Sequence, residues 1–328
     1  MSTARVAILG ASGYVGRELA ALVAQHPELH LAACMGARAG ITPEPPELPV
    51  DLAIEPLDLD RLDGVDAVFV CTPHGHAAPL VQEALHRGCR VVDLSADFRL
   101  RDPELYAATY GVEHPCPELL EEAVYGLTEH ARGQLATARL CANPGCYPTS
   151  ILVPLLPLLD AGLLGEGPII SDSKSGVSGA GQAPGRRNVF GAVAENFLAY
   201  GVGTHRHAPE IAQVAGTDRV VFVPHLLPMF RGMLSTLYVS PVPGTDADAV
   251  RNCLAERYRD EPFVRVFDRG QPETNRVART NQCHIGVAAV GSQVVITSAI
   301  DNLGKGAAGQ ALQNLNAMLG LPEGLGLR

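Results

Sequence analysis

Apolar residues follow a different pattern in each half of the chain. In the first half, short apolar runs alternate with segments whose apolar residues recur at helical spacing, such as 77–87. The short runs lie at 6–9, 29–35, 67–71 and 90–94. Strands that alternate with helices predict a doubly wound parallel sheet. The Pro-rich segment 41–63 interrupts this pattern, and we expect it to be irregular.

The second half contains β-branched runs with little helix between them. They lie at 168–174, 220–223, 232–242, 264–267 and 294–297. Such a succession predicts a mixed, mostly antiparallel sheet. We therefore expect an α/β domain followed by an α+β domain, and a last helix that starts near residue 301 and carries Leu312, Leu315 and Leu319.

The first expected strand ends at a glycine turn with the spacing G-x-x-G-x-x-G. A helical pattern follows it, and strand, glycine turn and helix together are typical of a dinucleotide site. Glycines let the backbone approach a pyrophosphate, which rests on the helix N-terminus. The residues expected to bind the cofactor here are Gly10, Ser12, Gly13, Tyr14, Val15 and Gly16.

The end of the second expected strand indicates which dinucleotide binds. It has no acidic residue for a ribose 2′-hydroxyl but has Arg38 within reach, which favours a 2′-phosphate and therefore NADP(H) over NAD. The other interpretation is that Arg38 is a solvated loop residue. Thr72 and Ser95 follow the next two strands and are expected near the cofactor, because ligands gather at the carboxyl ends of such strands.

Composition and charge exclude several classes of protein. The chain has 328 residues and a net charge of −10 without a basic block, which gives no support for binding to nucleic acid or to an anionic membrane. No apolar run is long enough to span a bilayer, and residues 1–10 lead into a strand without a signal peptide, so we expect a cytoplasmic protein. The eight cysteines include no C-x-x-C pair, and we expect no metal site.

Cys146 is the candidate nucleophile. It follows the Pro-Gly turn 144–145 and precedes an apolar run, 151–159, that predicts a helix with Pro148 in its first turn. Free N–H groups and the helix dipole favour a thiolate at that position, and a thiolate attacks carbonyl carbons readily. The other interpretation is that Cys146 is a buried small apolar residue, as many free cysteines are.

Two further segments offer groups for a reaction. The stretch 175–181 has three glycines and two serines, which suits either a hinge or a loop that binds phosphate or the nicotinamide. If 204–207 is extended, His205 and His207 point to one face, and Pro209 with Glu210 open a helix. A histidine can shuttle a proton beside a cysteine, and Glu210 can fix its tautomer; otherwise both histidines are structural.

Six motifs together resemble one enzyme family, N-acetyl-γ-glutamyl-phosphate reductase of arginine biosynthesis, a relative of aspartate-semialdehyde dehydrogenase. They are GASGYVG at 10–16, DLSADFR at 93–99, NPGCYPT at 143–149, SGVSGAG at 175–181, HRHAPEI at 205–211 and DNLGKGAAGQA at 301–311. The resemblance implies a glyceraldehyde-3-phosphate-dehydrogenase-like architecture. Its Rossmann domain would comprise 1–145 and 303–328, and its catalytic and oligomerisation domain would be 146–302.

The resemblance also implies a reaction and an assembly. The reaction is NADPH-dependent reduction of an acyl phosphate to a semialdehyde and phosphate through a cysteine thioester, and the assembly is a homo-oligomer, a tetramer or a dimer. Cys146 is the implied nucleophile, and His205 and His207, oriented by Glu210, are the implied proton-transfer and oxyanion groups. Which histidine does which remains open, although we favour His205 as the partner of the thiol.

Other roles follow from the resemblance alone. It assigns Ser175, Gly176 and Asn302 to the cofactor, and Arg99, Asn143 and Ser178 to the substrate. The family often has Ser-Arg at the end of the second strand, whereas Ala37-Arg38 here keeps only the arginine.

Three alternatives remain open from the sequence. The first is the same reaction on a substrate one methylene longer, the α-aminoadipate branch of lysine biosynthesis, because one methylene gives weak discrimination. The second is a cysteine hydrolase with a Rossmann half. The third is a non-catalytic module that senses NADP.

Overall fold

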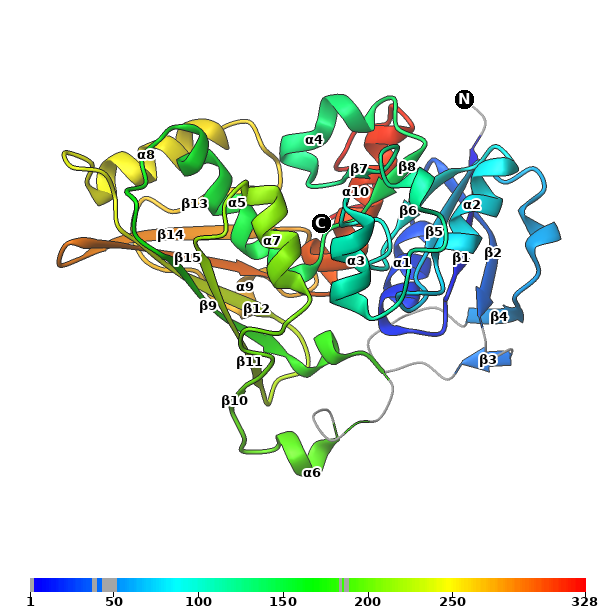
Figure 1. Cartoon of the computed structure of the whole chain (residues 1–328). Helices are drawn as coiled ribbons and strands as arrows, with labels where there is room; N and C mark the ends of the chain where they lie inside the picture. Colours follow the sequence, from blue (N-terminus) through cyan, green and yellow to red (C-terminus); the bar gives the residue numbers. More distant parts are fainter. Residues whose placement is uncertain (1–2, 37–39, 43–51, 183–184, 186–188) are drawn as a thin grey trace. The chain divides into compact units, whose positions relative to one another are not determined.

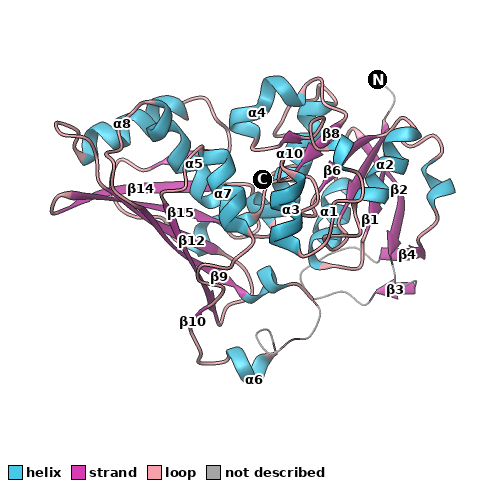
Figure 2. Cartoon of the chain, in the orientation of Figure 1, coloured by secondary structure: helices cyan, strands magenta, loops and turns pink. Residues whose placement is uncertain are grey.

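The structure is a computed structural model that describes residues 3–36, 40–42, 52–182, 185 and 189–328. The chain forms two compact units, Met1–Gly145 with Ala307–Arg328, and Cys146–Gly306. Figure 1 shows the path of the chain and Figure 2 its helices and strands. No helix in the described part of the chain is long and apolar enough to cross a membrane.

The first unit is built on an eight-stranded sheet with the order β3-β4-β2-β1-β5-β6-β8-β7. All of its pairings are parallel except that of β3 with β4, which confirms the expected parallel sheet. The strands are β1 (Ala4–Leu9), β2 (Leu29–Gly36), β3 (Gly40–Thr42), β4 (Leu52–Pro56), β5 (Ala67–Val70), β6 (Arg90–Asp93), β7 (Val124–Tyr125) and β8 (Leu140–Ala142). The helices are α1 (Tyr14–Ala24), α2 (Ala78–His86), α3 (Pro103–Tyr110), α4 (Thr128–Leu135) and α10 (Gly309–Met318).

The central strand β1 shows why this sheet has helices on both faces. Its residues are buried on both sides: Val6 and Ile8 belong to one apolar core, and Ala7 and Leu9 belong to another. The first core includes residues of α1, α4 and α10, and the second includes residues of α2. A continuous apolar run is what a parallel strand covered on both faces requires.

Part of the first unit differs from the sequence-based expectation. The segment 41–63 was expected to be irregular, but its described parts contain the end of β3, the strand β4 and a short 3₁₀ helix, Leu59–Leu62. Sequence patterns did not predict them because both strands are short, and because β4 pairs with β2 and β3 pairs with β4.

The second unit is built on a seven-stranded sheet with the order β10-β11-β9-β12-β15-β14-β13. Four of its six described pairings are antiparallel, as expected; β11 with β9 and β13 with β14 are parallel. The strands are β9 (Ile169–Gly176), β10 (Leu198–Ala199), β11 (Val220–Leu227), β12 (Met233–Val239), β13 (Val264–Val266), β14 (Cys283–Val290) and β15 (Gln293–Ile300). The helices are α5 (Cys146–Asp160), α6 (Phe190–Val193), α7 (His207–Ala215), α8 (Ala247–Arg257) and α9 (Thr274–Val277).

Helices α5, α7 and α8 cover one face of this sheet (Figure 2). Alternate residues of β9 and β12 are buried on that side, while the residues between them are partly exposed. The strand β14 was not predicted from the sequence, because its run Cys283–Val290 contains a histidine and a glycine at buried positions and has no regular apolar alternation.

Helix α5 contains two prolines that would normally break it, Pro154 and Pro157. Proline has no N–H, so Pro157 cannot bond the carbonyl of Val153 four residues earlier. The hydroxyl of the buried Tyr258 donates to that carbonyl instead. Tyr258, at the end of α8, thereby supplies the hydrogen bond that the Val153 carbonyl would otherwise lack.

Replacing Tyr258 with phenylalanine tests this role. We expect the free energy of unfolding of Tyr258→Phe to fall by about 1–3 kcal/mol, the cost of a buried polar group without a partner. The measurement is urea unfolding followed by circular dichroism. Tyr238→Phe, at a partly exposed tyrosine of β12, is the control and should change the free energy by less than about 0.5 kcal/mol. Equal effects of both substitutions would contradict the assignment.

Candidate active site

The glycine turn after β1 is as tight as the motif predicts. Gly10 has φ +86°, and a Cβ there would lie 2.7 Å from the carbonyl carbon of Cys71. A Cβ on Gly16 would lie 2.5 Å from the carbonyl oxygen of Gly10. The turn therefore brings β1, the end of β5 and the first turn of α1 into backbone contact, and only glycine fits at these two positions.

The same turn leaves room and polar groups for a ligand. Gly13 precedes α1 in an extended conformation, and a Cβ there would meet nothing closer than 3.8 Å. The Oγ1 atom of Thr72 is buried and has no hydrogen-bond partner among the described residues. Since Gly10 abuts the backbone of Thr72, this unsatisfied hydroxyl lies at the turn. The N-terminus of α1 and the Thr72 hydroxyl fit the pyrophosphate of a dinucleotide.

Ser95, Arg99 and Asn143 lie together in the first unit, but their side chains bond the protein itself. Ser95 donates to the buried Asp93 carboxylate at 2.8 Å. The Arg99 guanidinium donates to the carbonyls of Asn143 and Leu94 at 2.9 and 3.0 Å. The Asn143 amide oxygen accepts from Asn314 at 3.0 Å. These bonds fix the segment that leads to Cys146.

Burial dominates the electrostatics of this cluster. It raises the pKa of Asp93 to about 7, against the opposing bonds from Ser95. The neighbouring Asp97 carboxylate accepts from three backbone N–H groups, at 2.7 to 3.1 Å, at and before the start of α2. Sequence analysis gave these two acids no role, because nothing in the motif shows that they are buried.

Cys146 is the first residue of α5, which confirms the expected helix start. The side chain is partly buried, and the thiol forms no disulfide. A Cβ on Gly306 would lie 2.9 Å from the Cβ of Cys146, so the backbone of the turn Gly304–Ala308 approaches the helix start directly. The thiol therefore has a glycine, not a side chain, as its neighbour on that side.

Asp301 holds that turn in place. Its fully buried carboxylate accepts from the backbone N–H groups of Leu303 and Gly304, at 2.9 and 3.2 Å, and from that of Arg279. It also forms an ion pair with Arg231 at 3.0 Å. Asp301 was part of a sequence motif but was given no role. Its position directly after a buried strand could have indicated that its carboxylate is buried and bonded.

The loop 175–181 and Asn302 form one hydrogen-bonded group. The Asn302 amide donates to the Ser178 hydroxyl at 2.9 Å and accepts from the backbone N–H of Gly232 at 2.8 Å. A Cβ on Gly176 would lie 2.7 Å from the carbonyl oxygen of Phe230. The Ser175 hydroxyl donates to the carbonyl of Gly176 at 3.1 Å. Close packing and these hydrogen bonds hold the loop 175–181 in one conformation, which favours the binding-loop interpretation over a hinge.

The expected extended conformation of 204–207 is wrong. Arg206 has helical dihedral angles, and α7 begins at His207, before Pro209. The reason is local: the Nδ1 atom of His205 accepts a hydrogen bond from the His207 N–H at 3.1 Å, which turns the backbone. The two imidazole rings are nevertheless close, with centroids 4.9 Å apart.

Tyr147 brings the histidines to the start of α5. Its ring lies 5.6 Å from that of His205 and 6.0 Å from that of His207, and it directly follows Cys146. Its hydroxyl donates to the carbonyl of His225 at 3.0 Å, and burial raises the pKa of Tyr147, so the phenol stays neutral. Sequence analysis missed Tyr147, because a buried aromatic residue in an apolar helix carries no polar pattern.

His205 and His207 differ in environment. Burial, with a contribution from the Arg206 charge, lowers the pKa of His205 to about 4, so this imidazole is neutral at pH 7. A neutral His205 can accept a proton, but it supplies no positive charge to a thiolate. His207 has its Nε2 atom 4.0 Å from the fully buried Glu210 carboxylate.

The structure thus groups the candidate residues by unit. The glycine turn, Thr72, Ser95, Arg99 and Asn143 belong to the first unit. Cys146, the histidines, Glu210, the serine-glycine loop and Asn302 belong to the second. Arg38 lies outside the described residues. In the described part of the chain, no group of three or more His, Cys, Asp or Glu side chains is placed to hold a metal ion.

A dinucleotide-type turn in one unit and a cysteine at a helix start in the other define an oxidoreductase of the semialdehyde dehydrogenase class. Residues 5–138 match the model of the semialdehyde dehydrogenase NAD binding domain, and residues 146–302 match that of the semialdehyde dehydrogenase dimerisation domain.

Comparison with relatives identifies the family within this class. The chain is 51% identical to an N-acetyl-gamma-glutamyl-phosphate reductase of Halorhodospira halophila, over 98% of this chain and 97% of the relative. A protein of Arabidopsis thaliana named as a probable chloroplastic N-acetyl-gamma-glutamyl-phosphate reductase is 46% identical, over 98% of this chain and 84% of its own. The chain belongs to the N-acetyl-gamma-glutamyl-phosphate reductase family.

Solved structures agree on the fold. Aspartate semialdehyde dehydrogenase II of Vibrio cholerae superposes with a TM-score of 0.73 at 18% identity, covering 97% of this chain and 99% of its own. The aspartate semialdehyde dehydrogenase of Candida albicans gives a TM-score of 0.66 at 16% identity, with 97% and 99% covered. At these identities the likeness shows the shared fold alone.

The half-buried His205 makes stability depend on pH in a defined direction. The folded protein keeps His205 neutral down to about pH 4, whereas the unfolded chain protonates it near its ordinary value of 6.5. Between these values the unfolded state binds more protons, so stability falls as the pH drops through the window. We expect His205→Gln to remove this contribution, so its urea midpoint should fall less than that of the wild type between pH 7 and 4.5.

The control for this measurement is His30→Gln, which removes an exposed imidazole. Its midpoint should follow the wild type across the window. Parallel curves for the wild type and His205→Gln would contradict the lowered pKa of His205.

Proposed function

We propose that this protein reduces N-acetyl-L-glutamyl 5-phosphate with NADPH to N-acetyl-L-glutamate 5-semialdehyde and phosphate, a step of arginine biosynthesis. The observation that carries the proposal is Cys146 at the start of α5, followed by Tyr147, whose ring contacts both histidines. Near-full-length relatives that are named for this reaction support it.

The reaction would proceed through a thioester on Cys146. The thiolate attacks the acyl carbon of the substrate, the C–O bond to phosphate breaks, and phosphate leaves with the bond's electron pair. Bound NADPH supplies a hydride for the reduction of the thioester carbon. The resulting tetrahedral oxyanion reforms a C=O bond and expels the thiolate, which releases the semialdehyde.

The histidines would manage protons and the oxyanion. His205 is neutral at pH 7, so it can accept a hydrogen bond from the thiol, while the N-terminus of α5 favours the thiolate. His207, oriented by Glu210, would face the developing oxyanion together with the Cys146 N–H. We propose this division because only His207 lies near a carboxylate that can orient it and stabilise its charged form.

The cofactor residues are those of the glycine turn, with Thr72 at its side. Backbone N–H groups at the start of α1 would hold the pyrophosphate, and Arg38 would hold the 2′-phosphate. Ser175, Gly176 and Asn302 would line the nicotinamide side. For Ser95 we propose a supporting role, because its hydroxyl already bonds Asp93.

On the substrate side, we propose that Arg99 and Asn143 act by positioning. The Arg99 guanidinium donates to the backbone carbonyl of Asn143, and the Asn143 amide oxygen accepts from Asn314 of α10. The Ser178 hydroxyl oxygen accepts a hydrogen bond from Asn302, and its O–H would donate to the substrate. The glutamyl substrate is favoured over the longer aminoadipyl homologue because the similar relatives are named for the former.

The assembly we propose is a homo-oligomer, a dimer or a tetramer, built on the sheet face of the second unit that lacks α5, α7 and α8. Three exposed apolar residues form a row there across paired strands: Val221 pairs with Ile170, and Ile170 pairs with Tyr238. They are 48%, 38% and 38% exposed. A contiguous apolar row on an uncovered sheet suits a self-complementary interface.

We also propose that the protein works in the cytoplasm. All eight cysteines are free, and five of them are buried in the folded units, which suits a reducing compartment.

The assay that tests the proposed reaction runs it in reverse. We expect NADP reduction with N-acetylglutamate semialdehyde and phosphate, at least about tenfold faster in kcat/KM than with the homologue one methylene longer, and no turnover without phosphate. The readout is the absorbance of NADPH. Preference for the longer substrate would indicate the lysine branch, and thioester or amide hydrolysis without NADP would indicate a hydrolase.

Cys146→Ser should lower this activity by at least about a hundredfold, because a serine hydroxyl is not ionised at neutral pH. Cys253→Ser, at another partly buried free cysteine of the same unit, is the matched control and should keep wild-type activity. Similar losses in both variants would remove Cys146 from its proposed role.

The interface has its own test. Val221→Lys should weaken self-association at least about tenfold in dissociation constant, because it places a charge in the apolar row. Light scattering coupled to gel filtration gives the mass at each concentration. Val112→Lys, at an equally exposed valine of the first unit, is the control. An unchanged mass for Val221→Lys would mean that the interface lies elsewhere.

A further inference from the structure

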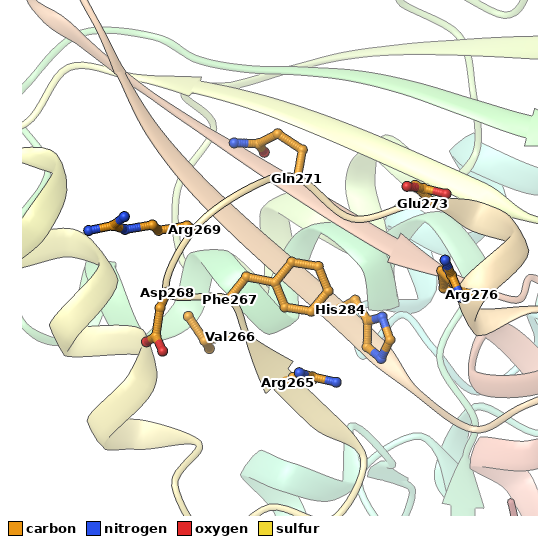
Figure 3. A pocket seen from close by; sticks show the side chains of 9 residues that line it. All are labelled: Arg265, Val266, Phe267, Asp268, Arg269, Gln271, Glu273, Arg276 and His284. Carbon is orange, nitrogen blue, oxygen red and sulfur yellow. The ribbon is translucent and has the colours of Figure 1, made fainter.

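A second site lies in the second unit, apart from the residues already discussed. An open cavity of about 700 Å³ is lined by β13, the chain that follows it, α9 and His284 of β14. This volume is in the range of small-molecule sites. Figure 3 shows the side chains that line it.

The cavity gathers positive charge in a chain that is acidic overall. Arg265, Arg269 and Arg276 line it, together with the acids Asp268 and Glu273. In Figure 3, Asp268 and Arg269 lie on the other side of the Phe267 ring from His284. Within the described residues, neither Arg265 nor Arg276 pairs with a carboxylate. Arg265 instead stacks over Phe267, 5.2 Å from the ring centroid.

His284 is the second, independent indication of a ligand. It is 9% exposed, and its Nδ1 atom is buried without a hydrogen-bond partner among the described residues. Burial and the charge of Arg265 lower the pKa of His284. The His284 Nδ1 atom is buried without a hydrogen-bond partner, which costs free energy. A bound anion could accept hydrogen bonds from both His284 and the neighbouring Arg265.

We propose that this cavity binds the phosphate group of a small molecule through Arg265, Arg276 and His284, with Phe267 against the apolar part of the ligand. The three donors come from β13, α9 and β14, so they can reach different oxygens of a tetrahedral group. A carboxylate offers only two oxygens in one plane. The site is independent of the reaction proposed above, because it includes none of that reaction's residues.

The test follows His284 itself by NMR of histidine-labelled full-length protein, with inorganic phosphate as the probe. The His284 signal is identified by its loss in His284→Gln. We expect phosphate to shift this signal saturably and to raise the pH at which His284 titrates, since a bound anion stabilises the imidazolium. Acetate should bind at least tenfold more weakly than phosphate.

Variants separate this site from any other phosphate site. The double variant Arg265→Gln/Arg276→Gln should weaken the phosphate effect on His284 at least tenfold. Arg269→Gln, which removes an arginine on the other side of Phe267, should leave it unchanged. Both variants change exposed residues, so they should fold as the wild type does.

The proposal is overturned if phosphate leaves the His284 signal unmoved, or if the double variant responds as the wild type does. Equal or tighter binding of acetate would overturn the choice of phosphate in favour of a carboxylate. If His284→Gln does not fold, crystals soaked in tungstate, a heavy phosphate analogue, locate the anion instead. Tungstate in the wild-type cavity and not in the double variant supports the site, and an empty wild-type cavity overturns it.

Discussion

The direct approach of two backbone segments governs the chemistry of the second unit. The turn Gly304–Ala308 packs against the start of α5 so closely that any side chain at position 306 would collide with Cys146. Asp301 sets this turn by accepting three backbone N–H groups while paired with Arg231. Removing one partner of such a buried pair is costly, because the remaining charge stays without compensation. The position of the thiol therefore depends on a carboxylate that never touches it.

A second constraint is the apolar environment of His205. His205 is neutral because it is packed against Tyr147, Tyr200 and Phe222, not because a partner holds its proton. The sequence favoured His205 as the partner of the thiol. In the folded unit its low pKa keeps His205 neutral and makes it a weak base, whereas His207 has the carboxylate neighbour. The fold therefore gives the two histidines different environments.

Sequence patterns predicted the parts of the fold that depend on residues close together in the chain. Buried strands such as Val6–Leu9, the glycine turn and the helix start at Cys146 were confirmed, because each depends on residues adjacent in the chain. The strand β14 was not predicted because it depends on its pairing with β15. The turn at His205 was not predicted because a side-chain hydrogen bond to the His207 N–H sets it, which a pattern of apolar residues does not show. The sequence also did not show that Tyr258 bonds the carbonyl left open by Pro157 or that Asp301 holds the turn beside Cys146, because these partners lie far apart in the chain or depend on burial.

The central claim is that Cys146 carries the acyl group between two half-reactions, and mass spectrometry of the acylated enzyme tests it most directly. The protein is mixed with N-acetylglutamyl phosphate in the absence of NADPH, quenched in acid and digested. The account predicts one N-acetylglutamyl group per chain, on the peptide that contains Cys146, with an equal amount of phosphate released and with loss of the label when NADPH is added. Phosphate release without acylation, or acylation of another residue, would contradict it.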